Sequence, residues 1–176
     1  MVSVHPVSVM SSTSSTGPPT ARTGAASGSD HEPLSAATRY AEFAAVTGLV
    51  TMVYNPLGGG LLTGRHTFDE DPSEGRFGDS RLAAMYKERY WNTAVFDAIS
   101  QLGTLADKAG IPMTELALRW LVSKPTTGPI LLGGSKVSHL QNNIAAIAAG
   151  PLDADLVAAC DEIGAALRGA MPNYNR

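Results

Sequence analysis

Apolar and polar residues follow two different spacings along most of this chain. From Ala37 to Met171, apolar residues mostly recur at the intervals of three and four that are typical of amphipathic helices. Two short runs, residues 49–54 and 130–132, are instead apolar on both faces, and both lead into glycines. A strand that is apolar on both faces is typical of a parallel sheet covered by helices on both sides, so we expect two buried, neighbouring parallel strands.

The helical spacing predicts helices on either side of these strands. The first ends at Gly48, where a left-handed cap would fit, and a long one begins after Asn92 and ends at Gly110. Another ends before Pro125, because proline disfavours helical geometry in the residue that precedes it. The polar, turn-rich residues 67–78 predict a long loop. The expected order is therefore helix, strand, two or three helices, strand, two helices.

This order contains too few strands for a complete α/β fold. Two strands make neither a closed barrel nor an open sheet with both faces covered. Either the chain is an unusual helical assembly, or it represents only part of a larger α/β fold.

The N-terminal residues 1–35 have a different composition from the rest. They form a Ser, Thr, Gly, Pro and Ala tract without apolar periodicity. Such a segment cannot bury enough apolar surface to offset the entropy lost on ordering, so we expect it to be disordered. The folded part is then predicted to cover residues 36–176.

Charge and cysteine content exclude several classes of protein. The net charge of -3 gives no electrostatic reason to expect a nucleic acid or an anionic membrane as a partner. No apolar run approaches the roughly 20 residues that a membrane span requires. Cys160 is the only cysteine, which excludes an internal disulfide, and its helical position predicts a core residue. We expect a cytoplasmic protein without a metal site.

The two glycine turns are the candidate chemical features. Each follows a predicted strand, in "NPLGGGLLTG" and in "LLGGSKVSHLQNN", and the second leads directly into a helix. Backbone amides that no side chain shields can approach a phosphate closely, and a helix N-terminus adds a favourable partial positive charge. A tight structural turn would need the same glycines. The residues alone leave both interpretations open.

Longer segments resemble a known family. "YNPLGGGLLTGRH", "GPILLGGSKVSHLQNNIAA" and "GPLDADLVAACDEIGAALRGAMPNYNR" are similar to the C-terminal half of aldo-keto reductases, within the aflatoxin aldehyde and succinic semialdehyde reductase subfamily. The resemblance runs from about residue 38 to residue 176. It implies the last strands and helices of a (β/α)₈ barrel, an α/β fold, that binds NADPH at the carboxyl ends of its strands.

The resemblance also implies which residues bind NADP(H). A tyrosine at the end of the first strand would stack on the nicotinamide, and the glycine loop would wrap the pyrophosphate through the amides of Leu57 and the glycines. Arg76 would reach the cofactor from the long loop. Ser135 and Lys136 would hold the 2′-phosphate. Together with the adenine contacts, where His139 and Asn142 depart from the residues usual in the family, the implied set is Tyr54, Asn55, Pro56, Leu57, Gly58, Gly59, Gly60, Leu61, Leu62, Thr63, Gly64, Arg65, Arg76, Ser135, Lys136, His139, Asn142 and Asn143.

Three further residues match substrate contacts of the subfamily. Tyr86 and Arg89 fall on a predicted helix, where they could equally be an ordinary helix face. Arg176 matches an arginine suited to pairing with a carboxylate. The implied substrate is a small aldehyde or ketone, which could itself carry a carboxylate.

The sequence holds no match to the family's catalytic aspartate, tyrosine, lysine and histidine, which lie on the earlier barrel strands. We therefore expect a truncated reductase, inactive unless those strands are supplied, and no catalytic residue is assigned. The alternative is a non-catalytic remnant that binds a cofactor or a protein. An incomplete barrel would expose a sheet edge, through which copies of the chain could pair.

Overall fold

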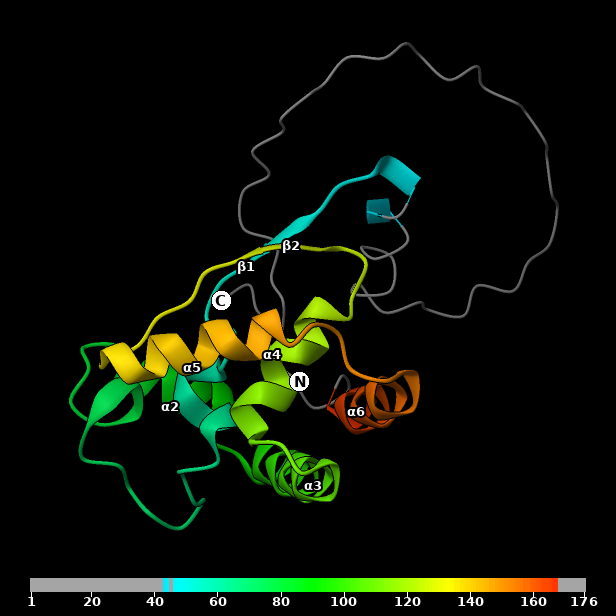
Figure 1. Cartoon of the computed structure of the whole chain (residues 1–176). Coiled ribbons are helices and arrows are strands. Elements are labelled where there is room, and N and C mark those ends of the chain that lie inside the picture. The colour runs from blue at the N-terminus through cyan, green and yellow to red at the C-terminus, as the bar shows by residue number, and fades with distance from the viewer. Residues whose placement is uncertain (1–42, 45, 168–176) are drawn as a thin grey trace, which may run out of the picture.

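The computed structural model describes residues 43–44 and 46–167 of the chain. The predicted disordered tail, residues 1–35, and Arg176 lie outside these residues. The described part forms a small parallel sheet with helices gathered on one side of it (Figure 1). In chain order the elements are β1 (Thr51–Val53), η1 (Gly58–Thr63), η2 (Gly75–Phe77), α2 (Ala83–Tyr90), α3 (Thr93–Ala109), α4 (Met113–Val122), β2 (Thr127–Ile130), α5 (Val137–Ala148) and α6 (Ala154–Ala166).

The two strands pair in parallel, as the apolar runs predict. Their ladder includes hydrogen bonds from the Thr51 amide to the Thr126 carbonyl, at 2.7 Å, and from the Leu131 amide to the Val53 carbonyl, at 2.8 Å. The chain between the strands contains α2, α3 and α4. Both strands therefore end at the same edge of the sheet, which is the property that brings the two glycine turns together.

The second strand lies earlier than predicted and is irregular. It covers Thr127–Ile130 instead of residues 130–132. Between the pairs Thr51–Thr127 and Val53–Ile130, one residue of β1 faces two residues of β2. Gly128 and Pro129 occupy this bulge. Proline cannot donate to a ladder, and glycine is poor in strands, so both residues argued against a strand here. A side chain on Gly128 would come within 2.9 Å of Val50, which explains the glycine.

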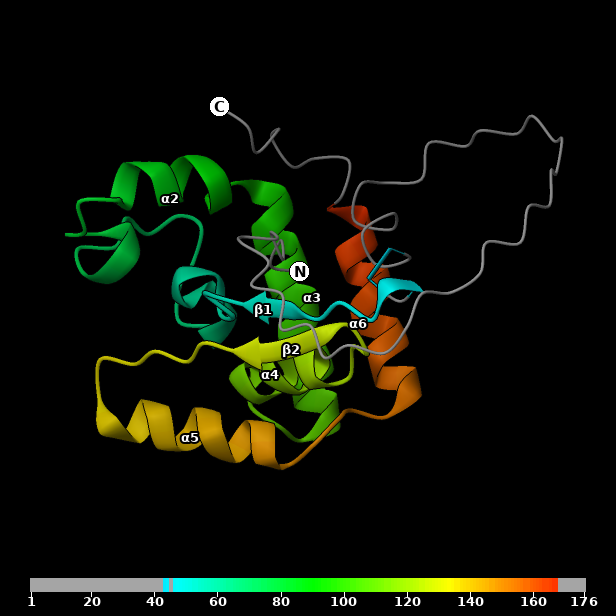
Figure 2. The same ribbon diagram turned by 90° about the horizontal axis from the view of Figure 1, so that it is seen from above.

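The expectation that the first strand is buried on both faces is wrong. Thr51 and Val53 are 6% and 3% exposed, whereas Val50, Met52 and Tyr54 are 60%, 49% and 40% exposed. Side chains alternate between the faces of a strand, so the exposed residues share one face. In Figure 1 the labelled helices all lie below the strands, and in Figure 2, seen from above, the strands pass in front of α3 and α4. Among the described residues, the other face has no helical cover.

The helix boundaries follow the caps that the sequence indicates. The Asn92 side chain accepts a hydrogen bond from the Val95 amide at 3.0 Å, and α3 ends at Gly110 with a left-handed φ of 67°. α4 ends at Val122, before Pro125. Gly48 has a left-handed φ of 71° and follows helical residues, as the sequence predicts. Of the apolar residues just before it, Ala44 is buried, whereas Phe43 and Val46 are exposed.

The core gathers around α3 and α4. Val95, Ile99 and Leu102 of α3 meet Leu116 of α4, and Cys160 brings α6 into the same cluster. Cys160 is 2% exposed, so the prediction of a core cysteine is confirmed. Burial raises the pKa of its thiol, with a smaller contribution from Asp161, so the thiol stays protonated and unreactive.

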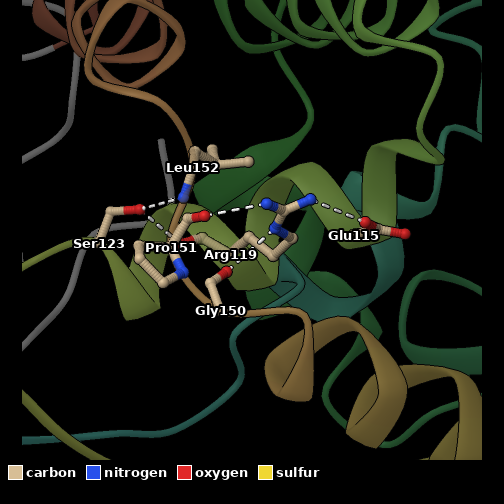
Figure 3. Close-up of polar contacts among 6 residues, drawn as sticks. All are labelled: Glu115, Arg119, Ser123, Gly150, Pro151 and Leu152. Carbon is tan, nitrogen blue, oxygen red and sulfur yellow. Dashed lines mark hydrogen bonds and ion pairs between the residues drawn. The ribbon is translucent and has the colours of Figure 1, made fainter.

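Polar side chains on α4 and directly after it form hydrogen bonds with the connection between α5 and α6 (Figure 3). The Arg119 guanidinium donates to the carbonyls of Gly150 and Pro151 at 3.0 and 2.9 Å, and to the Glu115 carboxylate at 3.1 Å. One turn later the Ser123 hydroxyl accepts from the Leu152 amide at 2.8 Å. These contacts fix the connection between α5 and α6 onto α4, and so orient α5.

A second polar contact joins α4 and its C-terminal extension to α6. The Asp161 carboxylate accepts from the Trp120 indole at 3.0 Å and from the Lys124 ammonium at 2.6 Å. The ammonium also lies 4.7 Å from the centre of the Trp120 ring. Since this ring lies against the apolar core, the group adds packing area as well as charge.

We expect Arg119→Ala to lower the free energy of unfolding by about 2 kcal/mol, because it leaves the half-buried Gly150 carbonyl and the exposed Pro151 carbonyl without their donor and removes the ion pair with Glu115. Urea unfolding followed by circular dichroism measures this change. Arg81→Ala is the matched control, since Arg81 is exposed. Equal stability of the two variants would contradict the role given to Arg119.

Candidate functional site

The two glycine turns lie beyond the carboxyl ends of β1 and β2. In Figure 2 both strand arrows point to the same side, and the chain continues from there into η1 and toward α5. The spatial relation that the parallel pairing predicted is therefore present. Arg76, Tyr86 and Arg89 come from η2 and α2, which contact this region from the side of η1.

The first turn uses most of its own amides internally. The Gly58 amide donates to the Asn55 carbonyl at 3.0 Å, and the Gly60 amide to the Leu57 carbonyl at 3.0 Å. The Gly59 amide donates to the Asn55 side chain at 2.8 Å. Asn55 itself has a φ of 52°, a conformation that asparagine tolerates better than most residues. The amides of the three glycines therefore stabilise the turn in this structure instead of pointing to a ligand.

Fewer groups of this turn are left to contact a ligand than the sequence suggests. Pro56, Leu61 and Leu62 are buried, and the Thr63 hydroxyl donates to the Gly60 carbonyl at 2.6 Å. Within the described residues, the Leu57 amide donates no hydrogen bond. We keep this amide as the best backbone donor for an anion in the turn.

The glycines are explained by their neighbours. Gly59 and Gly60 have φ values of 73° and 108°, which L-residues with a side chain rarely adopt. A side chain on Gly59 would come within 2.9 Å of the Tyr86 ring, and one on Gly60 within 3.3 Å of the Arg65 guanidinium. The bare backbone thus lets an aromatic ring and a cation lie directly on the turn.

Two arginines flank the turn. Arg65 donates from Nε to the His66 imidazole at 3.2 Å, and its Nη2 lies near Gly60 and Gly75. Arg76, next to Gly75, donates from Nη1 to the Tyr86 hydroxyl at 3.2 Å. In the part of the chain that the structure describes, neither guanidinium pairs with a carboxylate. Two such cations beside a tight turn favour an anionic ligand.

The long loop that carries Arg76 contacts the neighbouring elements at several points. The neighbouring Phe77 is fully buried, and Trp91 donates to the Phe68 carbonyl at 3.0 Å. Lys87 forms an ion pair with Asp71. These contacts fix the loop at several points, so Arg76 is held in place before any ligand arrives.

The second turn is exposed. Lys136 precedes α5 and caps it without a side-chain hydrogen bond, and the Ser135 hydroxyl lies 3.4 Å from Nδ1 of His139. Lys136 has no carboxylate partner within the described residues. The His139 amide donates to the Lys136 carbonyl at 3.1 Å, so the amides of Val137 and Ser138, a serine hydroxyl and an ammonium are the groups left for a phosphate monoester.

The predicted adenine contacts are not equivalent in the structure. Asn142 and His139 are exposed on α5. Asn143 is 4% exposed, and its side chain faces the Gly133 carbonyl at 3.4 Å. Asn143 therefore packs against the second turn and is hardly accessible to a ligand.

The two predicted substrate contacts that are described lie on α2. Tyr86 is 7% exposed, and its ring packs on Phe77 and Tyr90 at 5.7 and 5.8 Å between ring centres. The Arg89 guanidinium lies 5.8 Å from the centre of the Tyr90 ring. Arg176 lies outside the described residues, so this structure does not bring the three together.

Sequence reasoning gave no role to His66, which the structure places among aromatic rings. The imidazole lies edge-on to Phe77 and Trp91 at 5.5 and 5.8 Å between ring centres. Burial, and to a smaller extent the charge of Arg65, lower the pKa of His66 below its ordinary value of 6.5. The neutral ring can then accept the hydrogen bond from Arg65. Adjacent Arg and His in the sequence were the only signal for this pair.

The described residues show neither a metal-binding group nor a membrane-spanning helix. The described residues contain no group of three histidine, cysteine or acidic side chains placed to hold a metal ion. No described helix combines the length and the apolar character needed to span a bilayer.

We expect Gly59→Ala to lower the free energy of unfolding by about 2 kcal/mol or more, because the new methyl group meets Tyr86 at a positive φ. Gly103→Ala is the matched control. Gly103 lies inside α3, nothing lies within 4 Å of an added Cβ, and alanine favours the helix. The same urea unfolding measurement should show the control unchanged or stabilised. Equal losses in both variants would contradict the packing described here.

We expect the free energy of unfolding to fall as the pH decreases below about 6.5, through the contribution of His66. The folded state holds its imidazole neutral, so the unfolded state binds the proton first, and this favours unfolding down to the lowered pKa of the folded state. Thermal melts between pH 7.5 and 5 measure the dependence. His66→Gln should flatten this contribution, whereas the same substitution at the exposed His139 should not.

Comparison with known proteins supports an assignment to a family. The sequence pattern of the Aldo/keto reductase family matches residues 30–165. Aflatoxin B1 aldehyde reductase member 2 of Rattus norvegicus is 34% identical over 141 residues, which cover 73% of this chain and 38% of that protein. The Homo sapiens protein of the same name is 33% identical over 141 residues, covering 73% and 39%. A probable voltage-gated potassium channel subunit beta of Arabidopsis thaliana is 30% identical over 112 residues, covering 60% and 32%.

These matches confirm the resemblance to aldo-keto reductases that the sequence motifs indicate. The chain spans less than half the length of these relatives. The family match nevertheless covers most of this sequence, including both turns and the strands that precede them. This chain belongs to the aldo/keto reductase family.

Proposed function

We propose that residues 36–176 form the C-terminal part of a (β/α)₈ barrel that reduces small aldehydes or ketones with NADPH. The observation that carries the proposal is the convergence of two glycine turns at the ends of adjacent parallel strands, with cations beside both. Ligands of parallel α/β folds bind at this edge of the sheet. Family membership and the aldehyde reductases among the relatives favour the same class of reaction.

The residues present fit a dinucleotide with three phosphates. In the proposal, Leu57 supplies its amide and Arg65 and Arg76 their charge to the pyrophosphate. Ser135, Lys136 and the first turn of α5 receive the 2′-phosphate. Tyr54 is 40% exposed at the end of β1, where its ring can stack on a flat heterocycle. The cations beside both turns lack carboxylate partners within the described residues, which suits a polyanionic ligand.

The chemistry would be divided between this part of the barrel and the rest. NADPH, when bound, supplies a hydride to the carbonyl carbon, and the carbonyl oxygen then needs a proton donor. None of the tyrosines in this sequence matches the family's catalytic motif. We propose that the described residues bind and orient the cofactor, and that the proton donor belongs to other barrel strands. A carboxylate on the substrate would be met by Arg89 and Arg176.

A second function is favoured by a separate observation. Val50, Met52 and Tyr54 leave an apolar sheet face without helical cover among the described residues, and one relative is named as a probable channel subunit. The chain could thus act through a protein contact without catalysis. Cofactor affinity distinguishes the two proposals, because a purely structural subunit has no need for a phosphate site.

We expect the chain to bind NADPH more tightly than NADH in a fluorescence titration. Lys136→Ala should weaken NADPH binding about tenfold, because a charge-assisted contact to the 2′-phosphate contributes about 1.5 to 3 kcal/mol, and should change NADH binding little. Lys108→Ala removes an equal charge from the exposed end of α3 and serves as the control. Equal affinity for the two cofactors in the unmutated chain would refute the proposed site at the second turn.

A further inference from the structure

Tyr86 occupies an unusual place for a predicted substrate contact. It is 7% exposed, and its ring lies between Phe77, Tyr90 and the backbone of Gly59. The one polar atom of the side chain accepts a hydrogen bond from Arg76. Little of Tyr86 is accessible to a bound molecule.

Arg76 is held by this tyrosine in two ways. Its Nη1 lies 3.2 Å from the Tyr86 hydroxyl, and its guanidinium carbon lies 5.5 Å from the centre of the same ring. A cation over an aromatic face is attracted by the ring's negative face, and the hydrogen bond fixes its direction. Both contacts come from one residue, so the position of Arg76 depends on Tyr86.

The same ring also contacts the glycine turn. Tyr86 Cδ1 and Cε1 lie 2.9 Å from where a Cβ of Gly59 would be, which leaves no space between ring and backbone for a side chain. Tyr86 is therefore in contact with the turn on one side and with Arg76 on the other. It sets the distance between the cation and the Leu57–Gly60 backbone.

We propose that Tyr86 is a positioning residue, which holds the Arg76 guanidinium beside the first glycine turn so that it meets a phosphate of the bound dinucleotide. The inference rests on the proposed function for the identity of the ligand. The expected substrate contact of Tyr86 stays a separate prediction. In the role proposed here the tyrosine acts through Arg76.

A double-mutant cycle on NADPH affinity tests the inference. Tyr86→Phe keeps the ring, and with it the packing on Gly59 and Phe77, but removes the acceptor for Arg76. We expect it to weaken NADPH binding about three- to tenfold, the range of one lost hydrogen bond to a charged group. In an Arg76→Met background the same substitution should have no further effect, because the group it positions is absent.

Tyr90→Phe is the matched control for this cycle. Tyr90 is one turn further along α2, equally buried at 7%, and packs on the same Phe77 ring, but Arg76 does not donate to its hydroxyl. Its NADPH affinity should equal that of the unmutated chain. An undiminished effect of Tyr86→Phe in the Arg76→Met background, or no effect of Tyr86→Phe at all, would overturn the inference.

A measurement without ligand separates this inference from the proposed function. Nitrogen-15 relaxation of the arginine side chains reports the order of the Arg76 guanidinium in the free protein. We expect Tyr86→Phe to make this group more mobile and Tyr90→Phe to leave it unchanged. Absence of NADPH binding in the unmutated chain would refute the proposed function, whereas equal Arg76 mobility in both variants would refute the positioning role.

Discussion

The parallel pairing of β1 with β2 is the constraint on which the candidate site depends. Parallel neighbours place their carboxyl ends at one edge, so both glycine turns lie there regardless of the residues between them. The long connection that parallel pairing requires is supplied by α2, α3 and α4. The same connection carries Arg76 and Tyr86 back to the first turn. One topological requirement thus brings together residues that are distant in the sequence.

The two glycine turns stay adjacent only if the helices remain packed in fixed positions against the sheet. Arg119 fixes the α5–α6 connection onto α4, and Asp161 fixes α6 onto the end of α4. Because α5 begins directly after Lys136, any movement of α5 relative to α4 would move the second turn relative to the first. The polar contacts of α4 therefore contribute to the geometry of the site, although none of them is accessible to a ligand there.

The sequence predicted which helices and strands form better than it predicted which hydrogen bonds the backbone amides of the turns make. Local signals such as Asn92 and Gly110 act through nearby hydrogen bonds, and the caps they predicted are present. The predicted position of the second strand was wrong: it lies at Thr127–Ile130. Gly128 and Pro129 form a bulge in it, which becomes visible only in the pairing with β1.

The sequence likewise predicted that the two glycine turns follow neighbouring strands, but not how the amides of the first turn are used. The glycines of the first turn were expected to present their amides to a pyrophosphate, and the amides are instead bonded within the turn. The contact of Tyr86 with Gly59 and Arg76 is long-range and leaves no local pattern. A sequence can show that a turn is bare, but which ring or ligand lies against it is decided by tertiary packing.

The exposed face of β1 connects the proposed cofactor site with the rest of the proposed barrel. Tyr54 shares this face with Val50 and Met52, since side chains at alternate positions point the same way. In a closed barrel this face would be the interior, and the ring proposed to stack on the nicotinamide would stand at its rim. Whatever covers Val50 and Met52 would then also decide how firmly Tyr54 is held. The proposed phosphate contacts, which lie beside η1, on η2 and just before α5, need no such cover. The proposed site therefore divides into a phosphate-binding part that the described residues complete and a nicotinamide-binding part whose order depends on the neighbour of the bare face.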